Sequence, residues 1–205
     1  MSQNRSHAVM AQRAEPHDSL DFFPTPPWAT RALCEHVAPI DGYLAWDPAC
    51  GDGSMYHPLC EYALAVAASD IHHYGWRHSV HDFLQPYLPD GIGGAEWVVT
   101  NPPFRLAEQF ARRALEIAET GVALLVRSVF TEGVGRYERL FRPHPPAIIA
   151  QFTERVPMVK GRLDGKASSA TAYAWFVWTR KPVTETRLAW IPPCRKILER
   201  RGDYA

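Results

Sequence analysis

Short apolar runs alternate with helical patterns along most of this chain. Between residues 106 and 119, apolar side chains recur every three or four positions, and Gly121 follows, so this stretch predicts a helix. A second, shorter helical stretch covers residues 56–63. Buried strands are predicted at 43–47, 64–69, 96–100, 122–126, 147–152 and 172–178. Strands that alternate with helices indicate a mainly parallel sheet in an α/β fold, and we expect the last two strands to pair antiparallel because no long helix separates them.

The composition is that of a folded globular domain. The chain has 205 residues, of which 46% are hydrophobic and 12% aromatic. We interpret residues 1–20 as a flexible lead-in, 21–185 as the folded domain and 186–205 as a C-terminal extension. No signal peptide and no apolar run of membrane-spanning length is present, so we expect a cytoplasmic protein without membrane contact.

The charge balance excludes a general electrostatic attraction to nucleic acid. Lys and Arg total 22, as do Asp and Glu, so the net charge is zero and any binding to a polyanion must depend on local patches. Residues 154–170 form a candidate patch, a long polar loop that carries Arg155, Lys160, Arg162 and Lys166. The simpler alternative is a mobile surface loop.

The ends of three predicted strands carry residues that suit a nucleoside. The first strand ends in a turn, in which glycines let the backbone approach a ligand closely; the turn contains Asp47, Pro48, Ala49, Cys50, Gly51 and Gly53. Asp70, followed by Ile71, ends the next strand and can accept hydrogen bonds from ribose hydroxyls. After a third short strand, Asp82 can accept from an exocyclic amine and Phe83 can lie against a purine. No phosphate-binding Lys follows the glycines, and the alternative is a tight turn with Asp70 as a helix cap.

A rigid tetrapeptide follows the strand at 96–100. It consists of Asn101, Pro102, Pro103 and Phe104. Each proline fixes φ and removes an N–H donor, so the Asn101 amide oxygen and the Pro102 carbonyl can face one point as acceptors. That pair suits an –NH₂ group on a planar ring, and Phe104 can stack on the ring. The alternative is a rigid turn with Phe104 in the core.

Together these segments resemble the AdoMet-dependent N6-adenine DNA methyltransferases, including small phage and prophage forms. The glycine turn, Asp70, Asp82-Phe83 and the tetrapeptide match that family's cofactor and catalytic motifs. Upstream, residues 22–28 resemble the extra motif that closes over the methionine end of AdoMet, with Pro24, Thr25 and Pro26 at its centre. The order of these motifs, with the extra motif first, is that of the gamma-type enzymes.

The resemblance implies a Rossmann-like AdoMet-methyltransferase fold, with a mainly parallel seven-stranded sheet and an antiparallel last hairpin. It implies AdoMet as the cofactor, held by the residues around both motifs and by Asn101, and duplex DNA as the substrate, with the target base flipped out. We expect no metal site, although His72, His73, His78 and His81 crowd one region, because no Cys or acidic residue completes a ligand set.

The sequence allows several alternatives for the substrate and for the part of the protein that recognises it. Larger members of the family carry a separate target-recognition domain, whereas here only one helix separates Phe104 from the next strand. Selectivity must come from the loop at 155–166, from a protein partner, or be weak. The same tetrapeptide also serves methylation of RNA base amines and of protein glutamine, and a cytosine-N4 enzyme or a non-catalytic AdoMet-binding subunit is a further alternative.

Overall fold

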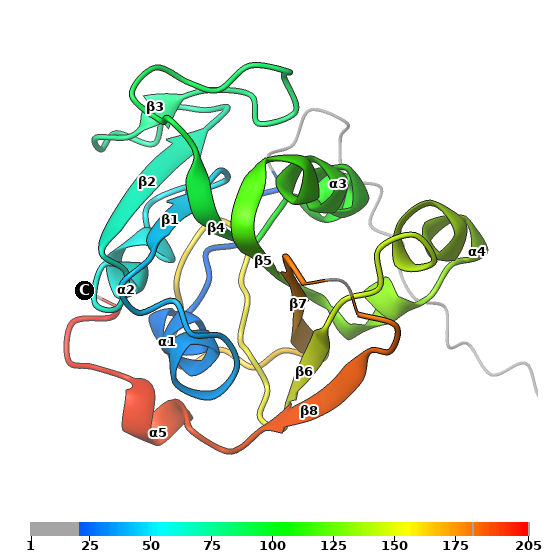
Figure 1. Cartoon of the computed structure of the whole chain (residues 1–205). Helices are drawn as coiled ribbons and strands as arrows, with labels where there is room; N and C mark the ends of the chain where they lie inside the picture. Colours follow the sequence, from blue (N-terminus) through cyan, green and yellow to red (C-terminus); the bar gives the residue numbers. More distant parts are fainter. Residues whose placement is uncertain (1–20, 182, 205) are drawn as a thin grey trace, which may run out of the picture.

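One eight-stranded sheet runs through the computed structural model, which describes residues 21–181 and 183–204 (Figure 1). The strand order is β3-β2-β1-β4-β5-β7-β6-β8. The strands are β1 (Leu44–Asp47), β2 (Ala65–Asp70), β3 (Ser79–Val80), β4 (Ala95–Thr100), β5 (Ala118–Arg127), β6 (Ile148–Phe152), β7 (Tyr173–Thr179) and β8 (Arg187–Ile191). Strands β1 to β5 are parallel, and β7 runs antiparallel to both β5 and β6. The predicted parallel sheet with a late antiparallel hairpin is therefore confirmed.

The eighth strand lies in the segment that we set apart as an extension. β8 pairs in parallel with β6 and forms an edge of the sheet. Leu188 and Trp190 are exposed, while Ile191 is buried. The apolar run from Leu188 to Ile191 is the signal that could have predicted this strand. The predicted lead-in, residues 1–20, lies outside the described residues.

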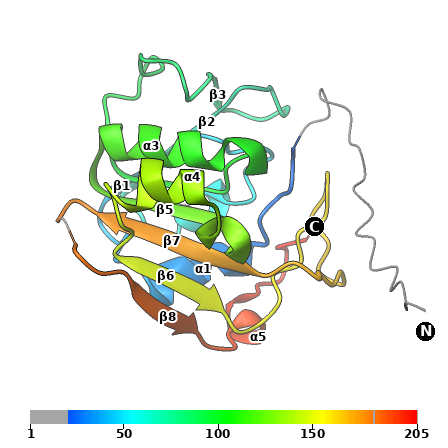
Figure 2. The ribbon, with the colours of Figure 1, turned by 90° about the vertical axis from the view of Figure 1, so that its right-hand side faces the viewer.

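Helices cover both faces of the sheet (Figures 1 and 2). Trp28 of one helix packs in a core with Trp97 and Trp175 on one face, and Phe110 of another packs with Trp46 on the other face. The helices are α1 (Pro27–His36), α2 (Tyr56–Leu59), α3 (Ala107–Ile117), α4 (Val134–Arg136) and α5 (Arg195–Leu198), with short irregular turns η1 (Phe104–Leu106), η2 (Ser128–Thr131) and η3 (Tyr137–Phe141).

Two helix predictions need correction. The helix predicted at 106–119 ends at Ile117, because Ala118 is already extended and pairs with Ala95 as the first residue of β5. The stretch at 56–63 is helical only as far as Leu59. Helix α1 was not predicted, although it begins with Pro27 and proline is common at the first position of a helix.

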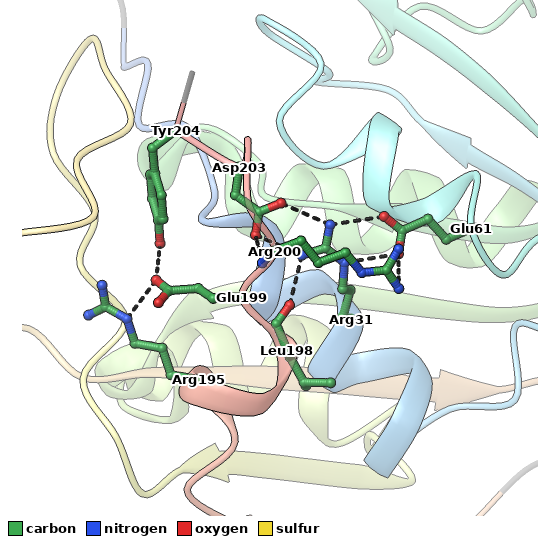
Figure 3. Close-up of polar contacts among 8 residues, drawn as sticks. All are labelled: Arg31, Glu61, Arg195, Leu198, Glu199, Arg200, Asp203 and Tyr204. Carbon is green, nitrogen blue, oxygen red and sulfur yellow. Dashed lines mark hydrogen bonds and ion pairs between the residues drawn. The ribbon is translucent and has the colours of Figure 1, made fainter.

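A buried arginine ties residues 198–203 to the first helix (Figure 3). Arg31 of α1 is 4% exposed and donates hydrogen bonds to both carboxylate oxygens of Glu61 and of Asp203, at 2.8–2.9 Å. It also donates to the Leu198 carbonyl at 2.8 Å. Burial alone would raise the pKa of Asp203, but the hydrogen bond from Arg31 and that from the Arg200 N–H outweigh burial and lower this pKa below its usual value.

The same C-terminal segment braces the loop between β6 and β7, beside which it lies in Figure 2. The Glu154 carboxylate accepts hydrogen bonds from the backbone N–H groups of Cys194 and Arg195, at 2.6 and 2.9 Å. The Arg195 side chain donates to the Gly165 carbonyl. Tyr204 packs so closely on Gly165 that a Cβ there would lie 2.9 Å from its ring.

None of the helices in the described part of the chain has the length and the apolar sequence that a bilayer crossing requires.

We expect Arg31→Ala to lower the free energy of unfolding by about 3 kcal/mol, because it strands the buried Asp203 carboxylate. Urea denaturation measures the change. The matched control is Arg142→Ala, which breaks a well-exposed ion pair with Glu138 and should cost less than about 1 kcal/mol. Equal costs for the two variants would show that the Arg31 contacts do not hold the segment.

Candidate functional site

A cavity of about 410 Å³ opens where the parallel strands β1, β2 and β4 end. The chain runs from β1 to one side of the sheet and then crosses to the other, so this is the switch point where such sheets bind ligands. The volume lies in the range of about 300–1,000 Å³ that small-molecule ligands occupy. Of the predicted site residues, those that line the cavity are Pro24, Thr25, Asp47, Ala49, Cys50, Asp70, Ile71, Asn101 and Pro103. Residues of the glycine turn and of the tetrapeptide therefore face one shared space.

The amide of Asn101 has a fixed orientation. Its nitrogen Nδ2 donates a hydrogen bond to the Phe23 carbonyl at 2.8 Å. A carbonyl can only accept, so the amide oxygen Oδ1 must point the other way. Oδ1 is buried and has no hydrogen-bond partner. Leaving such an acceptor unsatisfied costs about 1–3 kcal/mol, which a donor bound in the cavity would recover.

Residues 21–25, which we call the strap, contact the tetrapeptide at residues 101–104. The Asp21 carboxylate accepts a hydrogen bond from the Phe104 N–H at 2.6 Å, and the rings of Phe23 and Phe104 lie 5.0 Å apart. The loop between β6 and β7 fastens the strap in turn, because the Gly161 N–H donates to the Phe22 carbonyl at 2.9 Å. The strap thus forms one wall of the cavity.

The space beside Gly51 is filled by the strap. Gly51 has φ +52°, and a Cβ there would lie 2.6 Å from the Phe22 ring. We expected this glycine to leave room for a ligand, whereas the structure gives that room to Phe22. The Phe22 ring also contacts Tyr74, with centroids 4.9 Å apart, and Trp76 donates to the Gly51 carbonyl at 2.7 Å. Aromatic side chains therefore enclose the glycine turn.

Asp70 joins the turn to the end of β2. One of its oxygens accepts from the Gly51 N–H and the other from the His72 N–H, both at 3.0 Å. Each carboxylate oxygen has a second lone pair, so Asp70 can still accept hydrogen bonds from ligand hydroxyls.

Asp47 is buried at the end of β1. Its Oδ1 accepts from the Thr100 hydroxyl at 2.7 Å and from the Ala49 N–H at 3.3 Å, while its Oδ2 is buried without a partner. Burial raises the pKa of this carboxyl to about 7, against the effect of those two hydrogen bonds and with a further increase from the charges of Asp70 and Asp52. A cation in the cavity would stabilise its ionised form.

The other predicted residues do not line this cavity. They are Pro26, Pro48, Gly51, Gly53, Asp82, Phe83, Pro102 and Phe104. Phe83 is 2% exposed, and its ring packs against Trp46 and Phe110, so it has no face for a purine. The Asp82 carboxylate accepts from the Leu84 N–H and the Gln85 amide within a local turn.

Three phenyl-ring residues that were not predicted as site residues also line the cavity: Phe22, Phe23 and Tyr74. Phe22 and Phe23 directly precede Pro24, Thr25 and Pro26 in the motif at residues 22–28. Tyr74 lies among the histidines that follow Asp70, and that crowding drew attention to metal binding instead. Among residues 21–181 and 183–204, no cluster of three or more His, Cys, Asp or Glu side chains could hold a metal ion.

The loop at 154–170 contacts Asn101 through the apolar side chain of Met158. The Met158 sulfur lies 3.8 Å from Asn101 Nδ2. The predicted cations Arg155, Lys160, Arg162 and Lys166 are all exposed, and Arg162 pairs with Asp164 at 3.2 Å. Their binding to nucleic acid stays a prediction.

Comparison with solved structures identifies the fold. A candidate class I S-adenosylmethionine-dependent methyltransferase from Listeria monocytogenes is similar, with a TM-score of 0.58 and 12% identity over 84% of this chain and 67% of that one. A candidate RNA methyltransferase from Pyrococcus horikoshii gives 0.59 and 15% identity over 83% and 91%. The fold is that of the AdoMet-dependent methyltransferases. No protein-family model matches the chain, and no curated protein matches it in sequence.

A third structure of this methyltransferase fold comes from a larger protein. The modification subunit of a candidate type I restriction enzyme from Vibrio vulnificus gives a TM-score of 0.59 and 15% identity over 85% of this chain. The chain spans only 48% of that subunit. At these identities the similarity establishes the fold alone.

Asp47 should make stability depend on pH. The unfolded carboxyl ionises near pH 4, at about 3.9, and the folded one at about 7. Between these values the folded state keeps a proton that the unfolded state has lost, so the contribution of Asp47 to the free energy of unfolding falls as the pH rises. Asp47→Asn should therefore be more stable than the wild type at pH 8, by about 2 kcal/mol or more, and nearly equal to it below pH ~4.

Urea denaturation from pH 4 to pH 8 measures this difference. Thr100→Val supplies a second arm, because it removes a hydrogen bond that lowers the Asp47 pKa and should move the transition to higher pH. A stability difference that does not vary with pH would contradict the assignment.

Proposed function

We propose that the protein transfers a methyl group from AdoMet to the exocyclic N6 of adenine in DNA, as a small gamma-type enzyme of the cytoplasm. The observation that carries the proposal is the unpartnered Asn101 Oδ1. Asn101 lines a single cavity together with Asp47 and Asp70. A positively charged methyl donor and the amine that receives the methyl group can therefore meet in this cavity.

The cavity residues fit AdoMet by their chemistry. Asp70 would accept hydrogen bonds from the ribose hydroxyls, and Asp47, with its unpartnered Oδ2, would face the cationic methionine end. Ile71 and Tyr74 replace Asp82 and Phe83 as the candidates for the adenine side, because they line the cavity. Pro24 and Thr25 of the strap would close over the methionine end. When bound, AdoMet supplies a methyl group on a positively charged sulfur.

Asn101 would orient the amine that receives the methyl group. Its Oδ1 would accept one amine hydrogen and so orient the nitrogen towards the methyl group; Pro102, the other predicted acceptor, does not line the cavity. Bound AdoMet would supply the methyl group and keep the electrons of the broken C–S bond, and the amine would release one proton to solvent after transfer. Orientation and electrostatic stabilisation carry this step, and no strong base is required before transfer.

Adenine in DNA is favoured over other amines by one sequence motif. The motif at residues 22–28 resembles that of the DNA enzymes. The Vibrio vulnificus structure is a subunit of an enzyme, and we propose that a protein partner contributes sequence selectivity to this chain.

The direct test offers labelled AdoMet to unmethylated duplex DNA, single-stranded DNA, bulk RNA and bulk protein. Mass spectrometry of the digested products identifies the modified atom. We expect N6-methyladenine from DNA. Label in RNA or in protein glutamine would move the proposal to another acceptor, and label in none of the four would remove the transferase assignment.

Asn101→Ala should lower turnover by about 100-fold or more, by analogy with the loss of one oriented polar group. Its affinity for AdoMet should stay within a few-fold of the wild type, because the Asn101 oxygen is aimed at the acceptor amine. Single-turnover transfer and calorimetric titration with AdoMet measure the two quantities. Unchanged turnover would remove Asn101 from the mechanism.

Asp70→Asn should affect AdoMet affinity more than turnover, the reverse of what we expect for Asn101→Ala. The variant keeps an acceptor for one backbone N–H but loses the charge and one acceptor oxygen that a ribose would use. We expect AdoMet affinity to fall by about 1–3 kcal/mol, and turnover with saturating AdoMet to fall far less than in Asn101→Ala. Equal AdoMet affinity in the variant and the wild type would place the ribose elsewhere.

A further inference from the structure

A second, smaller cavity adjoins the tetrapeptide on the side of Phe104. Its volume is about 180 Å³, and it is lined by Phe104, Arg127, Val129, Phe130 and Arg136, among others. The larger cavity is lined by Asn101 and Pro103 but not by Phe104. The tetrapeptide therefore contributes to both cavities, its acceptor amide to one and its aromatic ring to the other.

Arg127 covers the Phe104 ring in this second cavity. Its guanidinium carbon lies 4.2 Å from the centroid of the ring. The arginine is the last residue of β5, which continues past the end of β4, because Thr100 pairs with Leu124. The extra length of β5 brings Arg127 alongside residues 101–104.

A stacked base would bind the Phe104 ring more strongly than the cation–π contact of Arg127 does, and the hydrogen bond between Arg127 and Tyr173 does not use that ring. Arg127 is exposed, and an exposed cation–π contact is worth about 0.5–1 kcal/mol. A nucleic-acid base stacked on an aromatic side chain is worth about 1–3 kcal/mol. A base that reaches Phe104 would therefore replace the guanidinium on the ring, and the guanidinium would remain beside the sugar and phosphate of the same nucleotide.

Arg136 has a different task. Its guanidinium stacks on Phe130 at 4.2 Å and donates to the Phe130 carbonyl at 2.9 Å, so it holds the turn after β5. The neighbouring Arg139 is paired with Glu108. Arg127 instead contacts the ring of Phe104 and hydrogen-bonds with the hydroxyl of Tyr173, its partner across β5 and β7.

We propose that Arg127 is a positioning residue that binds the phosphate of the target nucleotide. In the free protein its planar guanidinium lies where the target ring would stack, and when the ring arrives it turns to the phosphate, which it can bind through two parallel hydrogen bonds. The inference rests on the proposed function, since it assigns Phe104 to the ring that carries the methylated amine. It goes further by naming a phosphate contact that a protein glutamine or a free nucleoside would lack.

The test measures binding of a fluorescently labelled single-stranded oligodeoxyadenylate to the full chain as the salt concentration rises. An oligomer of the same length without bases serves as the second probe. For the oligodeoxyadenylate, Arg127→Gln should weaken binding about tenfold. The negative slope of log affinity against log salt should also become less steep by about 0.7, the value for one phosphate contact on a single strand.

Two further variants control the experiment. Arg127→Lys keeps the charge but not the planar group, so it should keep the wild-type salt slope. Arg187→Gln removes an exposed arginine on the edge strand β8 and should behave as the wild type. On the oligomer without bases, Arg127→Gln should lose less affinity than on the oligodeoxyadenylate, since no ring displaces Arg127 from Phe104. Circular dichroism and thermal denaturation establish that each variant is folded.

Methyl transfer gives an independent measurement. Arg127→Gln should raise the KM for DNA about tenfold and leave the affinity for AdoMet unchanged. Transfer by the wild type together with an unchanged salt slope and KM in Arg127→Gln would overturn the inference and leave the proposed function intact. Binding that depends on Arg127 without any transfer would support the phosphate contact and overturn the proposed function.

Discussion

The orientation of one side-chain amide decides what the main cavity can bind. Because the Phe23 carbonyl holds Asn101 Nδ2 at 2.8 Å, the buried Oδ1 is left as an acceptor without a donor. Reversal of the amide would place two acceptors face to face. The strap thus does more than cover the cavity, since its backbone determines the polarity of the residue on which the proposed chemistry depends.

That hydrogen bond is supported by contacts that reach far across the fold. The strap is fastened to the loop between β6 and β7 by the Gly161 N–H, and that loop is braced by Glu154 and by Arg195 of the C-terminal segment. Arg31 anchors the same segment to α1 (Figure 3). The polar atoms at the site are therefore placed by a series of contacts, and each of these joins two parts of the chain that are distant in sequence.

Much of the fold could be predicted from the sequence, because strand periodicity and the punctuating glycines and prolines are local signals. The glycine turn, Asp70 and Asn101 could be chosen for the same reason, since each follows a short apolar run. Phe83 was misplaced because a residue after a short strand can point to either side, and Trp46 and Phe110 bury its ring. The contacts of Phe22 with Gly51 and of Arg127 with Phe104 join distant segments, so no local pattern indicates them.

The Arg31 contacts have a consequence for synthesis on the ribosome. Arg31 and Asp203 are separated by 172 positions. While the chain is emerging, the Arg31 guanidinium can pair with Glu61 but still lacks the Asp203 carboxylate and the Leu198 carbonyl. The full set of Arg31 contacts is therefore completed only after translation has passed residue 203, so the first helix gains its last partners at the end of synthesis.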